Sequence, residues 1–273
     1  MKTVTYTIDD EIVTFQVEGG VVRGTGDVLL AADDDVTAGC AWADAGFTVS
    51  PFLETDDQQR MKAGFTALIR EEVEKLGVTV DEAFTPGRYH EYVDTDEVHV
   101  RVIETTRHGF PVHRLPISLA RVEALVSEIC GRPLTSRGSN MPSHSFYLRI
   151  VRPRSADNNP PHRDVYLDRL RNAVNLYLPV SGSTEKSSLP LLPGSHLWPE
   201  SVIERTADGA RVDGVEFAVP AVTATDTPFA MVRPNPAEGE VLLFSPYLIH
   251  GGARNFNEDE TRVSLEMRFW SAS

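Results

Sequence analysis

Hydrophobic and polar residues alternate near the start of the chain. Residues 4–8 and 12–17 each place apolar side chains at every second position, and the polar residues Asp9, Asp10 and Glu11 lie between the two runs. Strand side chains point alternately to opposite faces of a sheet. The pattern therefore predicts a β-hairpin over residues 4–17.

Two later stretches repeat their apolar residues at helical spacing instead. The first extends from Asp56 to Leu76 and is followed by Gly77, and the second extends from Leu119 to Ile129 and is followed by Gly131. Glycine after the last apolar position is typical of a helix end. We expect both helices to pack one apolar face against the core.

From Ser145 onward the pattern is rich in short strands. We expect strands at residues 146–151, 172–179, 240–244 and 261–270, with weaker strand signals between 200 and 235. Many short strands with few helices between them are typical of a double-sheet jelly roll. The predicted fold class is mainly β with flanking helices, in one domain (1–273) with an N-terminal elaboration (1–140) and a jelly-roll core (145–270).

The composition of the chain limits the kinds of molecule that it is expected to bind. The formal net charge is −14, which argues against nucleic acid, because phosphate backbones require a basic surface. No apolar run approaches the ~18 residues of a membrane span, and no apolar leader follows Met1. Cys40 and Cys130 form no disulfide framework or metal motif. We expect a cytoplasmic protein with a small-molecule partner; the oligomeric state stays open.

The sequence Pro161-His162-Arg163-Asp164 is the first candidate for chemistry. In an extended segment the side chains of His162 and Asp164 lie on the same side, so an imidazole and a carboxylate can converge on one metal ion. With 8 histidines and 40 acidic residues among 273, about one such pair is expected by chance. A strand histidine beside a surface carboxylate is therefore the alternative.

A third ligand candidate lies at the end of an apolar strand. Residues 240–244 lead to His250, which is followed by Gly251 and Gly252. Two histidines and one carboxylate form the facial triad that is typical of non-haem Fe(II) oxygenases and leaves coordination positions open. We expect His162, Asp164 and His250 to bind iron.

An arginine twelve positions further on suits an acidic cosubstrate. Arg262 and Ser264 share one face of their predicted strand, and a guanidinium with a neighbouring hydroxyl can bind a carboxylate such as that of 2-oxoglutarate. Arg254 and Arg268 are rival anchors. In the other interpretation, the polar residues of this strand form a solvent-exposed face.

Taken together, the motifs resemble those of the phytanoyl-CoA dioxygenase-like family of Fe(II)/2-oxoglutarate oxygenases. The resemblance covers roughly residues 145–270. It is carried by His162-x-Asp164, Pro193-Gly194-Ser195-His196, Gly239-Glu240, Phe244, His250-Gly251, Asn255 and Arg262.

This resemblance implies a double-stranded β-helix (cupin-like) core with iron at one mouth. It implies His162, Asp164 and His250 as iron ligands and Arg262 as the 2-oxoglutarate anchor, whereas His196 is not a ligand. Family members often have a small hydroxyl residue two positions after the distal histidine, where this chain has Gly252.

The reaction implied by the resemblance uses Fe(II), 2-oxoglutarate and O2, and it yields succinate and CO2. Hydroxylation of a small polar metabolite or natural-product intermediate is the expected reaction. Desaturation, ring closure, epimerisation and a cupin-like metal protein that does not use 2-oxoglutarate stay open. Asp164 argues against a halogenase, because the resembling halogenases have a small residue there. Tyr147, Asn175 and Tyr177 are the candidate substrate residues.

Overall fold

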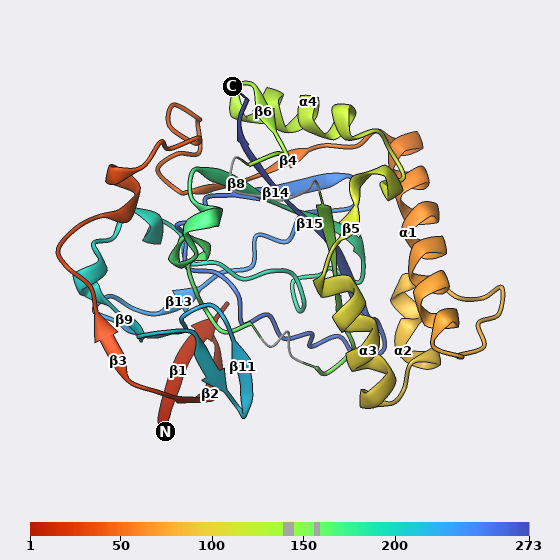
Figure 1. Ribbon diagram of the computed structural model, residues 1–273, viewed down its shortest axis with the longest axis horizontal. Coiled ribbons are helices and arrows are strands. Elements are labelled where there is room, and N and C mark those ends of the chain that lie inside the picture. Colours follow the sequence, from red (N-terminus) through yellow and green to blue (C-terminus); the bar gives the residue numbers. More distant parts are fainter. Residues whose placement is uncertain (139–144, 156–158, 273) are drawn as a thin grey trace.

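A seven-stranded sheet forms the largest layer of the structure (Figure 1). Six strands follow one another in space, and the seventh, β6 (Leu134–Thr135), pairs with β15. The six are β4 (Phe47–Pro51), β14 (Glu240–Phe244), β8 (Ala173–Ser181), β15 (Arg262–Ser271), β7 (Ser145–Val151) and β5 (Phe110–Pro111). All four strands predicted after Ser145 are present, with ends that differ by at most two residues.

The computed structural model describes residues 1–138, 145–155 and 159–272. The boundary between the predicted N-terminal elaboration (1–140) and the predicted core (145–270) lies mostly outside this described part. Among the described residues, no helix combines the length and the apolar character that a membrane crossing requires.

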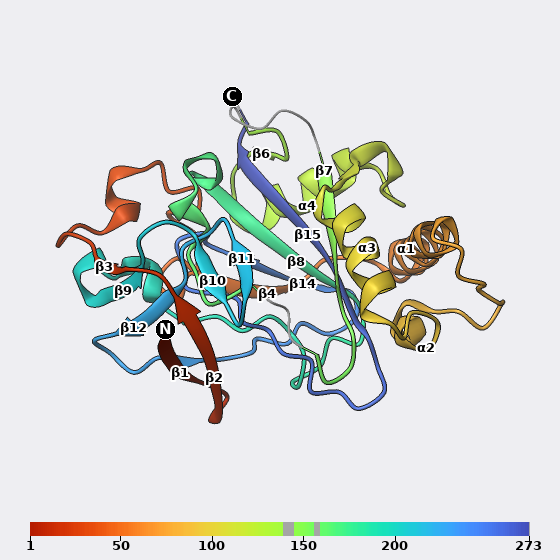
Figure 2. The ribbon, with the colours of Figure 1, turned by 60° about the horizontal axis from the view of Figure 1, so that its bottom comes forward.

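Helices cover one face of the large sheet, along the top and right of Figure 1 and on the right of Figure 2. Both predicted helices are confirmed, and two further helices lie between them in the sequence. The helices are α1 (Thr55–Lys75), α2 (Tyr89–Tyr92), α3 (Asp96–Arg107) and α4 (Leu119–Cys130). Phe65 of α1 and Val126 of α4 belong to the same buried cluster as Leu148 and Leu265 of the sheet. Burial of these apolar side chains holds the helices against the sheet.

Helix α3 was not predicted from the sequence. Val102 is almost fully buried, whereas Val98 is only partly buried and Val100 is 52% exposed. A helix with so narrow an apolar face gives a weak periodic signal. Its start is fixed locally, because the side chain of Thr95 accepts a hydrogen bond from the backbone of Val98.

The second layer begins with the predicted hairpin, which is confirmed. Strands β1 (Lys2–Ile8) and β2 (Glu11–Glu18) pair in antiparallel register. They form a five-stranded sheet with β10 (Ala210–Val212), β11 (Val215–Phe217) and β13 (Ala230–Met231). A three-stranded sheet contains β12 (Val222–Thr225), β9 (Ile203–Thr206) and β3 (Val21–Arg23).

Short extended segments link the second layer to the centre of the molecule. His250 forms antiparallel bridges with both His162 and Leu191, and Leu191 also bridges to Val232. The fold is therefore mainly β with flanking helices, and it has the double-stranded β-helix architecture. Its described sheets do not close into one continuous barrel.

Candidate active site

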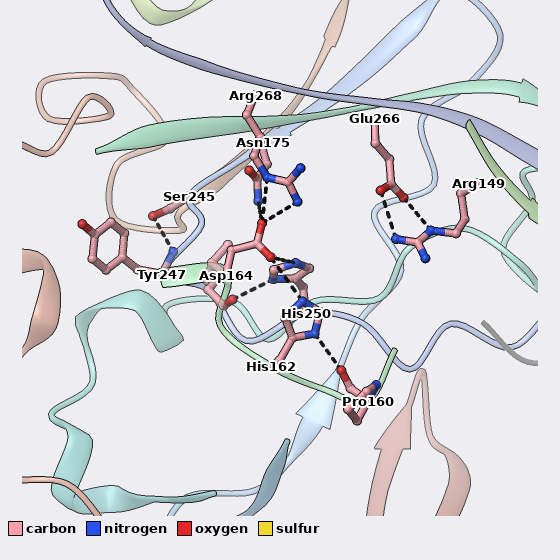
Figure 3. A network of polar contacts seen from close by, with 11 residues as sticks. Arg149, Pro160, His162, Asp164, Asn175, Ser245, Tyr247, His250, Glu266 and Arg268 are labelled. Carbon is pink, nitrogen blue, oxygen red and sulfur yellow. Dashed lines mark hydrogen bonds and ion pairs between the residues drawn. The ribbon is translucent and has the colours of Figure 1, made fainter. Parts of the chain in front are cut away.

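Two histidines and one aspartate meet between the layers of the fold (Figure 3). The backbone N–H groups of His162 and His250 donate to each other's carbonyl oxygens at 2.9 and 3.0 Å. This reciprocal pairing places the ring centroids 4.5 Å apart. One ligand atom from each of His162, Asp164 and His250 lies within 4.8 Å of the others, and all three residues are buried.

Backbone carbonyls determine which nitrogen of each imidazole is available. Nδ1 of His162 lies 2.7 Å from the carbonyl oxygen of Pro160, and Nδ1 of His250 lies 2.9 Å from that of Leu248. Because a carbonyl can only accept, Nδ1 carries the hydrogen in each ring, and in the neutral form of the ring Nε2 is the nitrogen with the lone pair. This arrangement gives both rings the orientation that metal ligation requires.

The two oxygens of Asp164 have different surroundings. Oδ1 lies 3.2 Å from Nε2 of His162 and 3.8 Å from Nε2 of His250. Oδ2 accepts hydrogen bonds from Asn175 Nδ2 at 2.9 Å and from Arg268 Nε and Nη2 at 3.2 and 3.0 Å. The carboxylate therefore presents one oxygen to the imidazoles, while the other is held by the protein.

The charges of these groups suit a divalent cation. Burial by itself raises the pKa of Asp164, but the Arg268 guanidinium and the two imidazoles together hold this pKa well below its ordinary value. Burial, followed by the neighbouring His162, lowers the pKa of His250 to about 4. At neutral pH the site thus offers one anionic oxygen and neutral imidazole nitrogen, the protonation states that metal ligands require.

Arg163 explains how the short motif is kept in place. Alternation directs its side chain away from His162 and Asp164, and the residue is fully buried. Its guanidinium forms an ion pair with Glu200 and donates to the carbonyl oxygens of Ser195 and Trp198. The segment that carries two of the ligand candidates is therefore anchored to the Pro-Gly-Ser-His turn and to the loop that follows it.

That turn is a structural element near the third ligand. The hydroxyl of Ser195 accepts a hydrogen bond from the backbone of Ile249 at 2.9 Å and donates to the carbonyl of Leu192 at 2.7 Å. Nε2 of His196 lies 2.8 Å from the carbonyl oxygen of Ala43. Ser195 thus fixes the residue that precedes His250, and His196 packs away from the metal site.

We expect Arg163→Met to lower the free energy of unfolding by about 3–5 kcal/mol, because it leaves the buried Glu200 carboxylate without its principal partner. Arg23→Met is the matched control, since the Arg23–Asp226 pair is half exposed and such pairs contribute little. Urea unfolding of both variants measures the difference. Equal stability of the two variants would contradict this assignment for Arg163.

The predicted cosubstrate residues are buried. Arg262 and Ser264 are 1% and 0% exposed, so the alternative of a solvent-exposed face is wrong. Nη1 of Arg262 donates to the carbonyl oxygen of Ser187 at 3.1 Å. The hydroxyl of Ser264 has no hydrogen-bond partner within the described part of the chain. A buried hydroxyl without a partner fits a binding site in which a carboxylate oxygen of the bound molecule accepts its hydrogen bond.

The rival anchors lie elsewhere. Arg254 is exposed, and its backbone carbonyl accepts a hydrogen bond from Arg233. Arg268 binds the metal-ligand candidate Asp164. These positions leave Arg262 as the buried arginine beside Ser264.

Two cavities share His162 and Asp164 in their linings, and the inner one also reaches His250. The inner cavity, about 50 Å³, is also lined by Asn175, Tyr177 and Phe244. The outer cavity, about 360 Å³, contains Tyr147 together with residues from β11 and α3. The hydroxyl of Tyr177 lies 2.8 Å from that of Ser183, and Asn175 holds Asp164. Of the candidate substrate residues, only Tyr147 lines the larger cavity.

The sequence interpretation missed the contacts that support the ligand candidates. It treated Arg268 as a rival anchor and Asn175 as a pocket residue, whereas both hold Oδ2 of Asp164. It also missed the ion pair between Arg149 and Glu266, whose two contacts are both 3.2 Å (Figure 3). One sequence signal was available for Arg268. The alternation along residues 262–268 places it on the same strand face as Arg262.

The fold and the three ligand candidates together are those of an enzyme with an iron site. The family model for phytanoyl-CoA dioxygenase (PhyH) matches residues 42–264, and the chain belongs to this family. Its cofactor is Fe(II), and its cosubstrates are 2-oxoglutarate and O2. The donor set, with two imidazole nitrogens and one carboxylate oxygen, fits this metal.

Several solved structures are similar to this chain. The non-heme alpha ketoglutarate dependent epimerase SnoN from nogalamycin biosynthesis is 15% identical, with 85% of this chain and 80% of that one covered and a TM-score of 0.44. AviO1 from Streptomyces viridochromogenes Tue57 is 18% identical, with coverage of 92% and 97% and a TM-score of 0.46. The apoform of EctD from S. alaskensis is 14% identical, with coverage of 93% and 85% and a TM-score of 0.46.

These similarities are too low to transfer a reaction or a substrate to this chain. No curated protein matches the sequence.

Proposed function

We propose that this chain is an Fe(II)/2-oxoglutarate-dependent dioxygenase that hydroxylates a small polar metabolite or natural-product intermediate, with succinate and CO2 as co-products. The observation that carries the proposal is the convergence of Nε2 of His162, Nε2 of His250 and Oδ1 of Asp164, three residues that all line the inner cavity. Each of these atoms is turned toward the others by a contact on the opposite side of its side chain.

In this proposal His162, Asp164 and His250 hold the iron, and Arg262 with Ser264 holds the distal carboxylate of 2-oxoglutarate. The bound iron and cosubstrate supply the oxidation of a substrate C–H bond. The protein keeps three coordination positions fixed and leaves the others accessible. It also excludes bulk water, since the ligand residues are only 4–6% exposed. No side chain is required as a general base for this step.

The size of the outer cavity supports a small-molecule substrate. Its volume of about 360 Å³ lies within the range of small-molecule sites. Its lining combines polar groups, including Arg149 and Glu266, with apolar groups, including Leu170 and Phe217. We assign Tyr147 to the substrate side, and Asn175 and Tyr177 to the metal and cosubstrate side.

The whole chain acts as one oxygenase unit in this proposal, because N-terminal segments contribute to both layers. Strand β4 pairs with β14, and strand β1 pairs with β13. Residues 103 and 106 of α3 line the outer cavity. The segment before residue 140 therefore shapes the substrate site.

Anaerobic titration tests the proposal. We expect one Fe(II) per chain and a visible charge-transfer band when 2-oxoglutarate is added, followed by succinate release with a competent substrate. Product mass then distinguishes addition of one oxygen from loss of two hydrogens or no net change. Full iron binding and full turnover in His250→Ala would reject the metal site on which the proposal depends.

A further inference from the structure

Arg268 has two hydrogen-bonding edges, and the protein uses one of them. Its Nε and Nη2 both donate to Oδ2 of Asp164. Nη1 has no hydrogen-bond partner among the described residues. A guanidinium can only donate, so its second edge, formed by Nη1 and Nη2, requires an acceptor.

The side chain of Arg268, which has this unused edge, reaches the cavity that is proposed to hold the substrate. Arg268 lines both the inner and the outer cavity, and its side chain is 22% exposed. In Figure 3 it lies above Asp164, on the side away from Pro160. An acceptor on Arg268 would therefore lie close to the metal-ligand candidates.

The nearest acidic group does not supply that acceptor. Glu266 also lines both cavities and contributes to the electrostatic environment of Arg268. However, Oε1 and Oε2 of Glu266 accept from Nε and Nη2 of Arg149, both at 3.2 Å. The carboxylate is thus engaged along its whole edge by another arginine.

The proposed cosubstrate anchor lies at the other end of the same strand. Arg262 and Arg268 are six residues apart on β15, which corresponds to about 20 Å of extended backbone. Arg262 contacts Ser187, whereas Arg268 contacts Asp164. The distal carboxylate of 2-oxoglutarate and the unused edge of Arg268 are therefore assigned to different regions of the site.

We propose that Arg268 determines substrate specificity by binding a carboxylate of the substrate with its Nη1–Nη2 edge, so that the substrate is a small carboxylic acid. The planar fork of two N–H groups matches the two oxygens of a carboxylate. The inference rests on the proposed function, because it places the substrate next to the iron ligands. It narrows the class of polar substrates to those with an acidic group near the oxidised carbon.

The test uses the full-length protein loaded with Co(II) and saturating 2-oxoglutarate, which does not require turnover. Pairs of small acids and their primary amides, from acetate and acetamide to 3-phenylpropionate and its amide, are titrated while the visible Co(II) absorption is recorded. We expect at least one acid to bind about tenfold more tightly than its amide. Arg268→Lys should lose this preference, because lysine can still contact Asp164 but lacks the second edge.

Arg169→Met is the matched control, because Arg169 lines the rim of the outer cavity but contacts neither Asp164 nor Glu266. It should keep the preference for acids. An absence of any acid preference in the wild type, or an undiminished preference in Arg268→Lys, would overturn the inference. Failure of Co(II) to bind the wild type would instead reject the proposed metal site, which distinguishes the two failures.

Discussion

Asp164→Gly is expected to abolish nearly all succinate formation and to weaken metal binding strongly. The change removes the only anionic protein ligand of the proposed iron site and leaves two neutral imidazoles. Loss of groups that merely support metal ligands typically costs about 10–100-fold in metal affinity or activity, so the loss of a ligand itself should cost more. Turnover at saturating iron and Fe(II) affinity under anaerobic conditions measure the two effects.

The control is Asp168→Gly, four residues further along the chain. The side chain of Asp168 is 94% exposed, and its ion pair with Arg171 has a distance of 3.3 Å. This variant should keep normal iron binding and turnover. If Asp164→Gly also retained near-normal hydroxylation, the carboxylate would have no part in the iron site, and the proposed function would fail with it.

Arg262→Met should mainly raise the KM for 2-oxoglutarate. Removal of one partner from a buried charge-assisted pair costs about 2–5 kcal/mol, and every 1.4 kcal/mol corresponds to about a tenfold change in affinity. The expected rise in KM is therefore between about 30-fold and several thousand-fold. Succinate formation at increasing concentrations of 2-oxoglutarate provides the measurement.

Arg254→Met provides the comparison for this cosubstrate experiment. Arg254 is exposed, whereas Arg262 is buried, so the loss of Arg254 should leave the KM for 2-oxoglutarate unchanged. Iron affinity should be the same in both variants. A normal KM in Arg262→Met would move the anchor to another residue.

The local features of the fold were predictable because they depend on short-range periodicity. The hairpin, helices α1 and α4, and the strands at 145–151 and 240–244 each have a clear apolar pattern. The expectation of a jelly roll followed from the density of strands late in the chain. The identity of each strand's neighbour could not be derived in this way, because pairing depends on contacts between distant residues.

The contribution of the N-terminal segment was underestimated for this reason. The sequence motifs that suggest the family begin near residue 145, whereas the family model begins at residue 42. Strand β4 is a short half-buried strand, and only its pairing with β14 makes it part of the main sheet. Nothing in its five residues signals this partner.

The metal-ligand candidates could be selected from the sequence because residue type and alternation constrain them strongly. Their supporting contacts could not. Arg268 was one of several arginines on the last strands, and its contact with Asp164 depends on the position of η4 (Asp164–Tyr166) against β15. Asn175 lies on β8, and its contact with Asp164 likewise depends on how that strand is placed against η4.

The reciprocal backbone pairing of His162 and His250 has a practical consequence for preparing the enzyme. Both imidazoles are positioned by the polypeptide itself, so metal loading does not require a folding step, unlike in small metal-dependent domains. Such a rigid set of nitrogen and oxygen donors accepts other divalent ions, and cobalt, nickel and copper generally bind more tightly than Fe(II). Protein isolated by nickel affinity should therefore carry foreign metal, and its activity will depend on chelation followed by anaerobic reconstitution with iron.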